Sequence, residues 1–186
     1  MHYESKIQQS IEALKEGLPI ILATDTVFGL AVSLKHAKSP DILYKLKGRP
    51  SNIPIPCLIS NRDALKSYVS QLSEDQIKFA KTHWPGANTL IFEVNGNYPK
   101  SFQSSQDSVG FRIPKHNFCL ELIDKLGSPL ACTSANLHGQ DATNSYEKID
   151  SCIKDKVFCP LPVDTCGSNQ PSKIFDLRKL PFKQLR

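Results

Sequence analysis

Short apolar segments, each only four or five residues long, constrain the fold of this chain more than any other feature. They occupy residues 20–23, 55–59, 109–113 and 129–132. Segments this short are typical of strands inside a sheet that is covered on both faces. The sequence therefore predicts a layered domain with a buried sheet.

Helical patterns lie between these strands. The first helix is expected to begin at a Ser5 cap, to bury a stripe formed by Ile7, Ile11 and Leu14, and to end at Gly17. Further helices are expected at 39–48 with Ser39 as cap, from Asn61, from Ser73 with Gln76 completing a capping box, at 118–126 before Gly127, and at 145–153. Additional strands are expected at 89–94 and 174–177.

The interleaving of these elements predicts the fold class. Helices and strands alternate irregularly along the whole chain, without an internal repeat or a linker. This pattern favours an α/β fold in which helices flank one twisted, open sheet of mixed and partly parallel strands. We expect a single domain that spans residues 1–186.

Composition narrows the classes of partner. Twenty-three Lys and Arg residues against 18 acids leave a formal charge of +5, which favours anionic partners such as nucleotides or RNA. The chain has no signal-peptide profile and no long apolar run, so we expect a cytoplasmic protein without membrane contact. Six cysteines never form Cys-x-x-Cys; Cys57, Cys119 and Cys132 lie among apolar residues and are interpreted as reduced core thiols.

Polar clusters beside the predicted strands and helices are the candidates for chemistry. The chain contains no P-loop, Rossmann glycine pattern, zinc-protease helix or nucleophile elbow. The clusters are Thr24-Asp25-Thr26; Lys45, Lys47 and Arg49; Arg112; and Thr133, Ser134 and Asn136. Ligands of open α/β sheets bind where strands end, so three of these four clusters lie at plausible positions.

Each cluster also has a structural interpretation. Thr-Asp-Thr is typical of turns, basic residues in a last helical turn favour the helix dipole, and Thr133-Ser134 is typical of a cap. Arg112 indicates more about function, because Val109, Phe111 and Ile113 flank it and would bury it in a central strand. A buried guanidinium needs an anionic partner. That partner is either a structural carboxylate or a bound anion.

Joined together, the cationic positions favour a polyanionic ligand. Lys47, Arg49 and Arg112, with nearby hydroxyl and amide groups, could neutralise a triphosphate and a carboxylate. No obvious nucleophile is present, so catalysis would depend on positioning and on charge neutralisation.

Six motifs resemble those of the YrdC/TsaC family, the threonylcarbamoyl-AMP synthases. In chain order they are TDTVFGL, KLKGRP, HWPGANTLIF, VGFRIP, TSANLHG and PSKIFD, and they lie between residues 20 and 176. The pairing of K-x-R with S-x-N is the family's signature. The resemblance is to the short, single-domain form, and it implies a YrdC-like α/β fold with a concave basic cleft.

The resemblance implies a reaction as well. L-threonine, bicarbonate and ATP, with Mg²⁺ accompanying the triphosphate, would become threonylcarbamoyl-AMP and pyrophosphate. Downstream threonylcarbamoyl-transferase proteins would then carry the group to tRNA, as threonylcarbamoyladenosine. The protein itself is expected to supply no metal ligand.

Eight positions take roles from the motif match. For ATP and catalysis they are Lys47, Arg49, Ser134 and Asn136, with Arg186 also beside the nucleotide. For threonine they are Thr26, Arg112 and Ser172. Ile53 and His138 depart from the family's usual residues. Ile53 cannot make one expected polar contact to ATP, and the neighbouring Asn52 or Ser51 is the alternative source of that contact.

Two other functions stay open at this stage. One is a tRNA-binding or double-stranded-RNA-binding maturation factor without catalysis, in which Lys35, Lys38, Lys45 and Lys47 contact phosphates. The other is a carbamoyl-adenylate site like that of hydrogenase maturation proteins, which the lack of acylphosphatase and zinc-finger segments disfavours.

Overall fold

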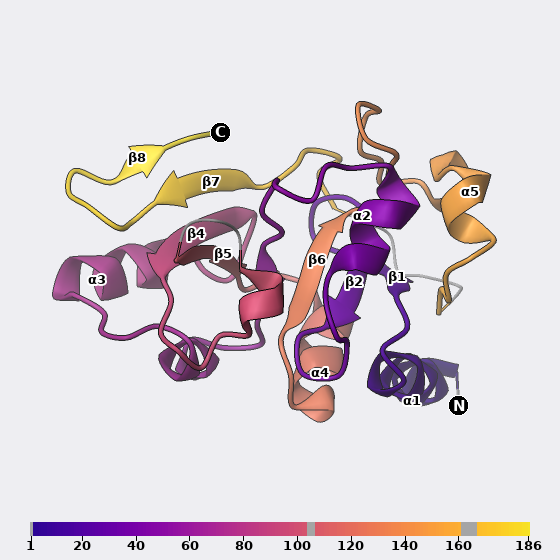
Figure 1. Cartoon of the computed structure of the whole chain (residues 1–186), viewed down its shortest axis with the longest axis horizontal. Helices are drawn as coiled ribbons and strands as arrows, with labels where there is room; N and C mark the ends of the chain where they lie inside the picture. Colours follow the sequence, from indigo (N-terminus) through magenta and orange to yellow (C-terminus); the bar gives the residue numbers. More distant parts are fainter. Residues whose placement is uncertain (1, 104–106, 161–166) are drawn as a thin grey trace.

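An open, eight-stranded sheet organises the chain in the computed structural model, which describes residues 2–103, 107–160 and 167–186 (Figure 1). The strands lie in the order β1-β2-β6-β3-β5-β4-β7-β8. Their bounds are β1 Ile20–Leu22, β2 Gly29–Ser33, β3 Cys57–Leu58, β4 Asn88–Glu93, β5 Ser108–Arg112, β6 Leu130–Ser134, β7 Lys173–Asp176 and β8 Lys183–Gln184. The pairs β3–β5 and β4–β7 are parallel and the other neighbours antiparallel, so the predicted open, mixed sheet is confirmed.

Helices of very different length connect the strands. The α-helices are α1 His2–Lys15, α2 Asp41–Lys47, α3 Glu74–His83, α4 Asn117–Leu126 and α5 Ser151–Lys154. Three short 3-10 helices are η1 Asp63–Ser67, η2 Lys100–Phe102 and η3 Tyr146–Lys148. Figure 1 shows the β7–β8 hairpin at one end of the molecule and α1 and α5 at the other.

The two faces of the sheet bury separate apolar clusters. On one face, Ile7 and Leu14 of α1 and Leu122 of α4 pack against Leu58 and Cys132. Along β1, β2, β3 and β6 the buried residues of the other face alternate with these, as the pleat of a β-strand requires.

The second cluster is the larger one. Leu43 of α2, Ala80 of α3 and Ile153 of α5 contribute to it, together with Cys57 and Phe111 from the centre of the sheet. A sheet covered in this way explains why its strands are short and almost continuously apolar.

Several helix ends agree with the local sequence signals. Ser73 accepts a hydrogen bond from the Gln76 backbone, and the Gln76 side chain accepts one from Ser73, so the capping box is confirmed. Helices α2 and α4 end at Gly48 and Gly127, whose φ angles of 58° and 65° are left-handed. Both glycines are favoured there because a side chain would be strained.

The predicted start of the first helix was wrong. Helix α1 begins at His2, so Ser5 lies inside it and is not its cap. Contacts with α4 stabilise the additional turn: the Tyr3 ring meets the Phe118 ring edge-on at 5.8 Å, and Glu4 pairs with Lys125 at 2.6 Å. A tertiary contact thus replaces the cap.

Three further boundaries differ from the sequence prediction. Strand β3 is only Cys57–Leu58, because prolines at 54 and 56 lack the N–H that a strand would donate. The helix expected over 145–153 is divided into η3 and α5, and Asp150 caps the second piece by accepting from the Cys152 N–H at 2.8 Å. Helix α2 begins at Asp41, with Pro40 rather than Ser39 in the cap position.

Gly110 in β5 offers a test of how tightly the sheet is packed. A Cβ at this position would lie 2.7 Å from Thr89 Cγ2 and 3.5 Å from Pro56 Cβ. We expect Gly110→Ala to lower the free energy of unfolding in urea by about 1–3 kcal/mol, as overpacking does. Gly96→Ala is the matched control, since a Cβ at that position would have no heavy atom within 4 Å among the described residues. Equal losses in the two variants would contradict this account.

Candidate functional site

A pocket of about 180 Å³ opens on the sheet face that also carries α1 and α4. Leu58 and Cys132 belong both to the cluster under these helices and to the pocket lining. The register aligns Leu58 with Arg112 and Gly29 with Ser134, and all four line the pocket. The pocket therefore occupies the part of this face that the two helices leave uncovered.

Six of the eight predicted site residues line this pocket. They are Thr26, Arg49, Arg112, Ser134, Ser172 and Arg186. They come from segments spread between the β1–β2 loop and the last residue of the chain. The other two, Lys47 and Asn136, are not among the lining residues and contact each other.

Arg112 is buried and held by three separate groups. Its Nε donates to the Gly86 carbonyl at 3.1 Å, its Nη1 donates to Thr26 Oγ1 at 2.9 Å, and its Nη2 forms an ion pair with Asp25. A guanidinium has five N–H groups. Among the described residues these contacts leave one N–H on each Nη unused, so the guanidinium can still donate to a bound carboxylate.

Lys47 is only 3% exposed, and carbonyl groups surround its ammonium. The Nζ donates to the backbone carbonyl of Ser134, to that of Asn136 at 2.5 Å and to Asn136 Oδ1 at 3.0 Å. The His138 N–H donates in turn to the Lys47 carbonyl at 2.8 Å. In this conformation Lys47 organises the turn after β6, and its burial excludes it from the surface that would contact RNA phosphates.

Arg49 and Arg186 provide the other two cations of the pocket. Arg49 donates from Nη1 to Thr133 Oγ1 at 3.0 Å and from Nη2 to the Pro54 carbonyl at 3.0 Å, while its buried Nε has no hydrogen-bond partner among the described residues. Burial and the positive charge of Arg186 both lower the pKa of Arg49, although Tyr44 acts in the opposite direction.

Arg186 itself donates through Nε and Nη2 to the Ser172 carbonyl, at 3.2 and 3.0 Å. Three guanidinium groups therefore line the pocket, and no Asp or Glu does within the described part of the chain. Such a pocket suits a ligand with several negative charges.

Thr24 and Thr89 also line the pocket but had no assigned role in the sequence. The Thr89 hydroxyl lies 2.9 Å from that of Ser172, joining β4 to the residue before β7. The sequence held one signal that could have identified Thr89. It is a polar residue in the predicted strand at 89–94, where every second side chain faces the same side of the sheet.

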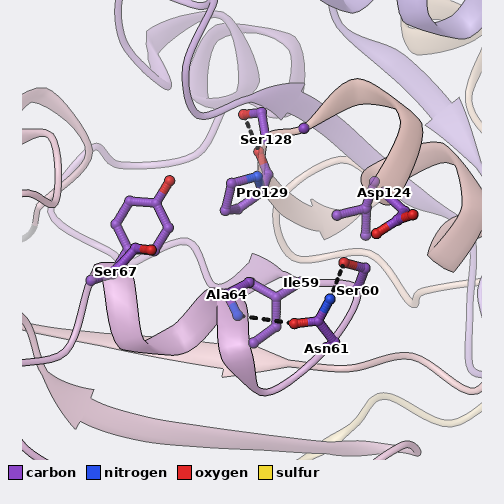
Figure 2. A pocket seen from close by; sticks show the side chains of 11 residues that line it. Ile59, Ser60, Asn61, Ala64, Ser67, Asp124, Ser128 and Pro129 are labelled. Carbon is purple, nitrogen blue, oxygen red and sulfur yellow. Dashed lines mark hydrogen bonds between the residues drawn. The ribbon is translucent and has the colours of Figure 1, made fainter.

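A second pocket, of about 280 Å³, lies between η1 and the end of α4 (Figure 2). Its lining includes Ile59, Asn61, Ser67, Asp124 and Pro129, and no Lys or Arg among the described residues. None of the predicted site residues reaches it. Its charge does not suit an anion, so the smaller pocket with three arginines is the better candidate.

The described residues were also compared with the requirements of a metal site and of a membrane-spanning helix. Within residues 2–103, 107–160 and 167–186, no three His, Cys, Asp or Glu side chains gather in a way that could hold a metal ion. Nor does any helix in these ranges have the length and apolarity needed to cross a membrane. Cys57, Cys119 and Cys132 are buried free thiols, as predicted, and Cys166 lies outside the described residues.

Comparison with known proteins agrees with the fold and the motifs. Residues 12–186 match the Sua5/YciO/YrdC family, described as "Telomere recombination". The chain belongs to this family.

Its relatives include the threonylcarbamoyl-AMP synthase of Vibrio campbellii, 28% identical over 92% of this chain and 94% of that protein. The enzyme of the same name from Pyrococcus abyssi is 27% identical over 98% of this chain, which spans only 54% of the archaeal protein.

Solved structures show the same architecture. P. abyssi Sua5 complexed with L-threonine superposes with a TM-score of 0.89 at 27% identity, covering 98% of this chain and 54% of that one. Escherichia coli YciO superposes with a TM-score of 0.85 over 98% of this chain and 89% of its own, but at 19% identity this likeness concerns the fold alone.

The pKa of Lys47 leads to a test of its buried position. Burial, and then the charge of Arg49, lower this pKa from 10.5 to about 8. Between these pH values the unfolded chain keeps the proton and the folded chain releases it, so the unfolded state binds more protons and stability rises with pH. We expect the wild-type free energy of unfolding to rise relative to Lys47→Met from pH 8 to 10.5, by about 3 kcal/mol at most.

The matched control for this measurement is Lys45→Met, because Lys45 is exposed on the same helix. That variant should follow the wild-type curve across the whole pH range. A constant difference between wild type and Lys47→Met would contradict the shifted pKa.

Proposed function

We propose that this chain is a threonylcarbamoyl-AMP synthase. L-threonine, bicarbonate and ATP would react to give threonylcarbamoyl-AMP, pyrophosphate and water. The product would pass in the cytoplasm to transferase proteins that modify tRNA. The observation that carries the proposal is a pocket with three arginines and, among the described residues, no lining Asp or Glu, in which Arg112 keeps one N–H on each Nη unused.

Threonine would bind through its carboxylate on the Arg112 guanidinium. Two parallel N–H···O bonds fix the orientation of a carboxylate as well as its position. The Asp25 ion pair, the Thr26 hydroxyl and the Gly86 carbonyl already hold the guanidinium, so little reorganisation would be needed. The archaeal Sua5 complexed with L-threonine, a relative of this chain, supports the choice of amino acid.

ATP would place its phosphates near Arg49 and Arg186. Arg49 and Arg186 line the same pocket, and the charge of Arg186 lowers the pKa of Arg49, so an anion bound near both would relieve their repulsion. Ser134 and Asn136 would border the nucleotide, with Lys47 holding their turn through three hydrogen bonds. Mg²⁺ would enter with ATP, and the phosphates would supply its charged ligands.

The chemistry would then need little beyond alignment. The threonine amine forms an N–C bond with the carbon derived from bicarbonate, and water leaves. An oxygen of the resulting carbamate attacks the α-phosphate of ATP, and pyrophosphate leaves. The arginines would stabilise the charge that develops on the phosphates, and the pocket would keep the reactants in contact.

The decisive measurement is pyrophosphate release from ATP and Mg²⁺. We expect release only when L-threonine and bicarbonate are both present, because the carbamate that attacks ATP contains both. Release without threonine would contradict the proposal. Salt-sensitive RNA binding without any pyrophosphate release would favour the RNA-binding alternative instead.

Replacing Arg112 by lysine tests the carboxylate clamp. Lysine keeps the charge but lacks the planar pair of N–H groups. We expect Arg112→Lys to raise the KM for threonine about 30- to 100-fold, corresponding to about 2–3 kcal/mol, while the KM for ATP changes less than about threefold. The control is Arg178→Lys, because Arg178 pairs with Asp176 away from the pocket. An unchanged KM for threonine would refute the clamp.

A further inference from the structure

Two buried threonines beneath Arg112 form a hydrogen-bond chain. Thr24 Oγ1 lies 2.7 Å from the Val27 carbonyl, 2.9 Å from Thr26 Oγ1 and 3.1 Å from the Thr26 backbone nitrogen. Arg112 Nη1 lies 2.9 Å from Thr26 Oγ1. Thr24 and Thr26 are 3% and 1% exposed, and both line the pocket with three arginines.

The direction of every bond in this chain is determined by one carbonyl. Since a carbonyl only accepts, the single proton of the Thr24 hydroxyl must point to the Val27 oxygen. Thr24 can then only accept from Thr26, so the Thr26 hydroxyl donates to it. The Thr26 backbone N–H occupies the second lone pair of Thr24.

These hydrogen-bond directions determine whether the Thr26 hydroxyl donates or accepts towards a ligand. Its proton is used on Thr24, and one of its two lone pairs accepts from Arg112. Within the described residues one lone pair remains, so towards the pocket the Thr26 hydroxyl is an acceptor only. It accepts from Nη1 of Arg112, a guanidinium that also pairs with Asp25 and keeps one unused N–H on each Nη.

The Arg112 guanidinium, a donor, next to the Thr26 hydroxyl, an acceptor, matches the carboxylate and the amino group of an α-amino acid. We infer that Thr24 is a positioning residue that keeps Thr26 an acceptor, and that Thr26 recognises the α-amino group of the amino acid whose carboxylate Arg112 binds. This inference rests on the proposed function and identifies how the substrate class is selected. Thr24 itself acts only through Thr26.

The polarity also suits the chemistry. An amine that donates an N–H to Thr26 keeps its nitrogen lone pair free to attack carbon. A hydroxyl that could turn its proton towards the amine would instead occupy that lone pair. Thr24 removes this alternative by accepting the proton itself.

Thr24→Val and Thr24→Ser are the matched variants that test the inference. Valine has nearly the same shape but accepts no hydrogen bond, whereas serine keeps the hydroxyl. Binding of L-threonine and of 3-hydroxybutyrate, which lacks the amino group, is measured by titration calorimetry without ATP. We expect Thr24→Val to lose about tenfold in affinity for threonine, with little change for 3-hydroxybutyrate. Thr24→Ser should keep the wild-type preference for threonine.

A purely structural role for Thr24 predicts a different result. If Thr24→Val weakens both ligands equally, or neither, the inference is wrong even where threonine still supports pyrophosphate release. If the wild-type protein binds no threonine, the proposed function fails together with it. Should Thr24→Val not fold, Thr26→Ala provides the same comparison, because it removes the acceptor directly; an unchanged preference for threonine would again overturn the inference.

Discussion

The buried guanidinium of Arg112 is the charge around which the site is built. Removing such a group from water costs several kcal/mol unless partners replace its hydration. Those partners come from two other segments: Asp25 and Thr26 follow β1, and Gly86 belongs to the turn before β4. The requirement to satisfy one cation therefore joins three parts of the chain at one end of the pocket. Among the described residues the same contacts leave one unused N–H on each Nη of a guanidinium that lines the pocket.

Lys47 is also a buried cation that needs partners to replace its hydration, but it keeps no N–H group for a ligand. It is even more buried than Arg112, at 3% against 6% exposed, but its partners are two carbonyls and one side-chain amide oxygen. An ammonium has only three N–H groups, and all three are used. A guanidinium has five in a rigid plane, so it can serve the fold and a ligand together. This difference explains why Arg112, and not Lys47, faces the pocket.

Local signals predicted the elements that depend on neighbouring residues. The Ser73–Gln76 capping box and the glycines that end α2 and α4 are examples, because each involves a few consecutive residues. The start of α1 was wrong for the opposite reason, since its first turn is stabilised by Phe118 and Lys125 of another helix. Strand β3 was predicted too long, over 55–59, because the apolar pattern was given more weight than the two prolines, whose effect on pairing is local.

The sequence by itself determined six of the eight described strands, all but β2 and β8, together with the cationic residues and the motifs that the chain shares with its family. It left Arg112 between a structural ion pair and an anion clamp. In the tertiary structure Arg112 forms the ion pair with Asp25, 87 residues away, and still keeps donors free. Lys47 is buried because the Asn136 turn, 89 residues further along, folds over its ammonium. Such contacts depend on distances between remote segments, and only the packing of the sheet determines those distances.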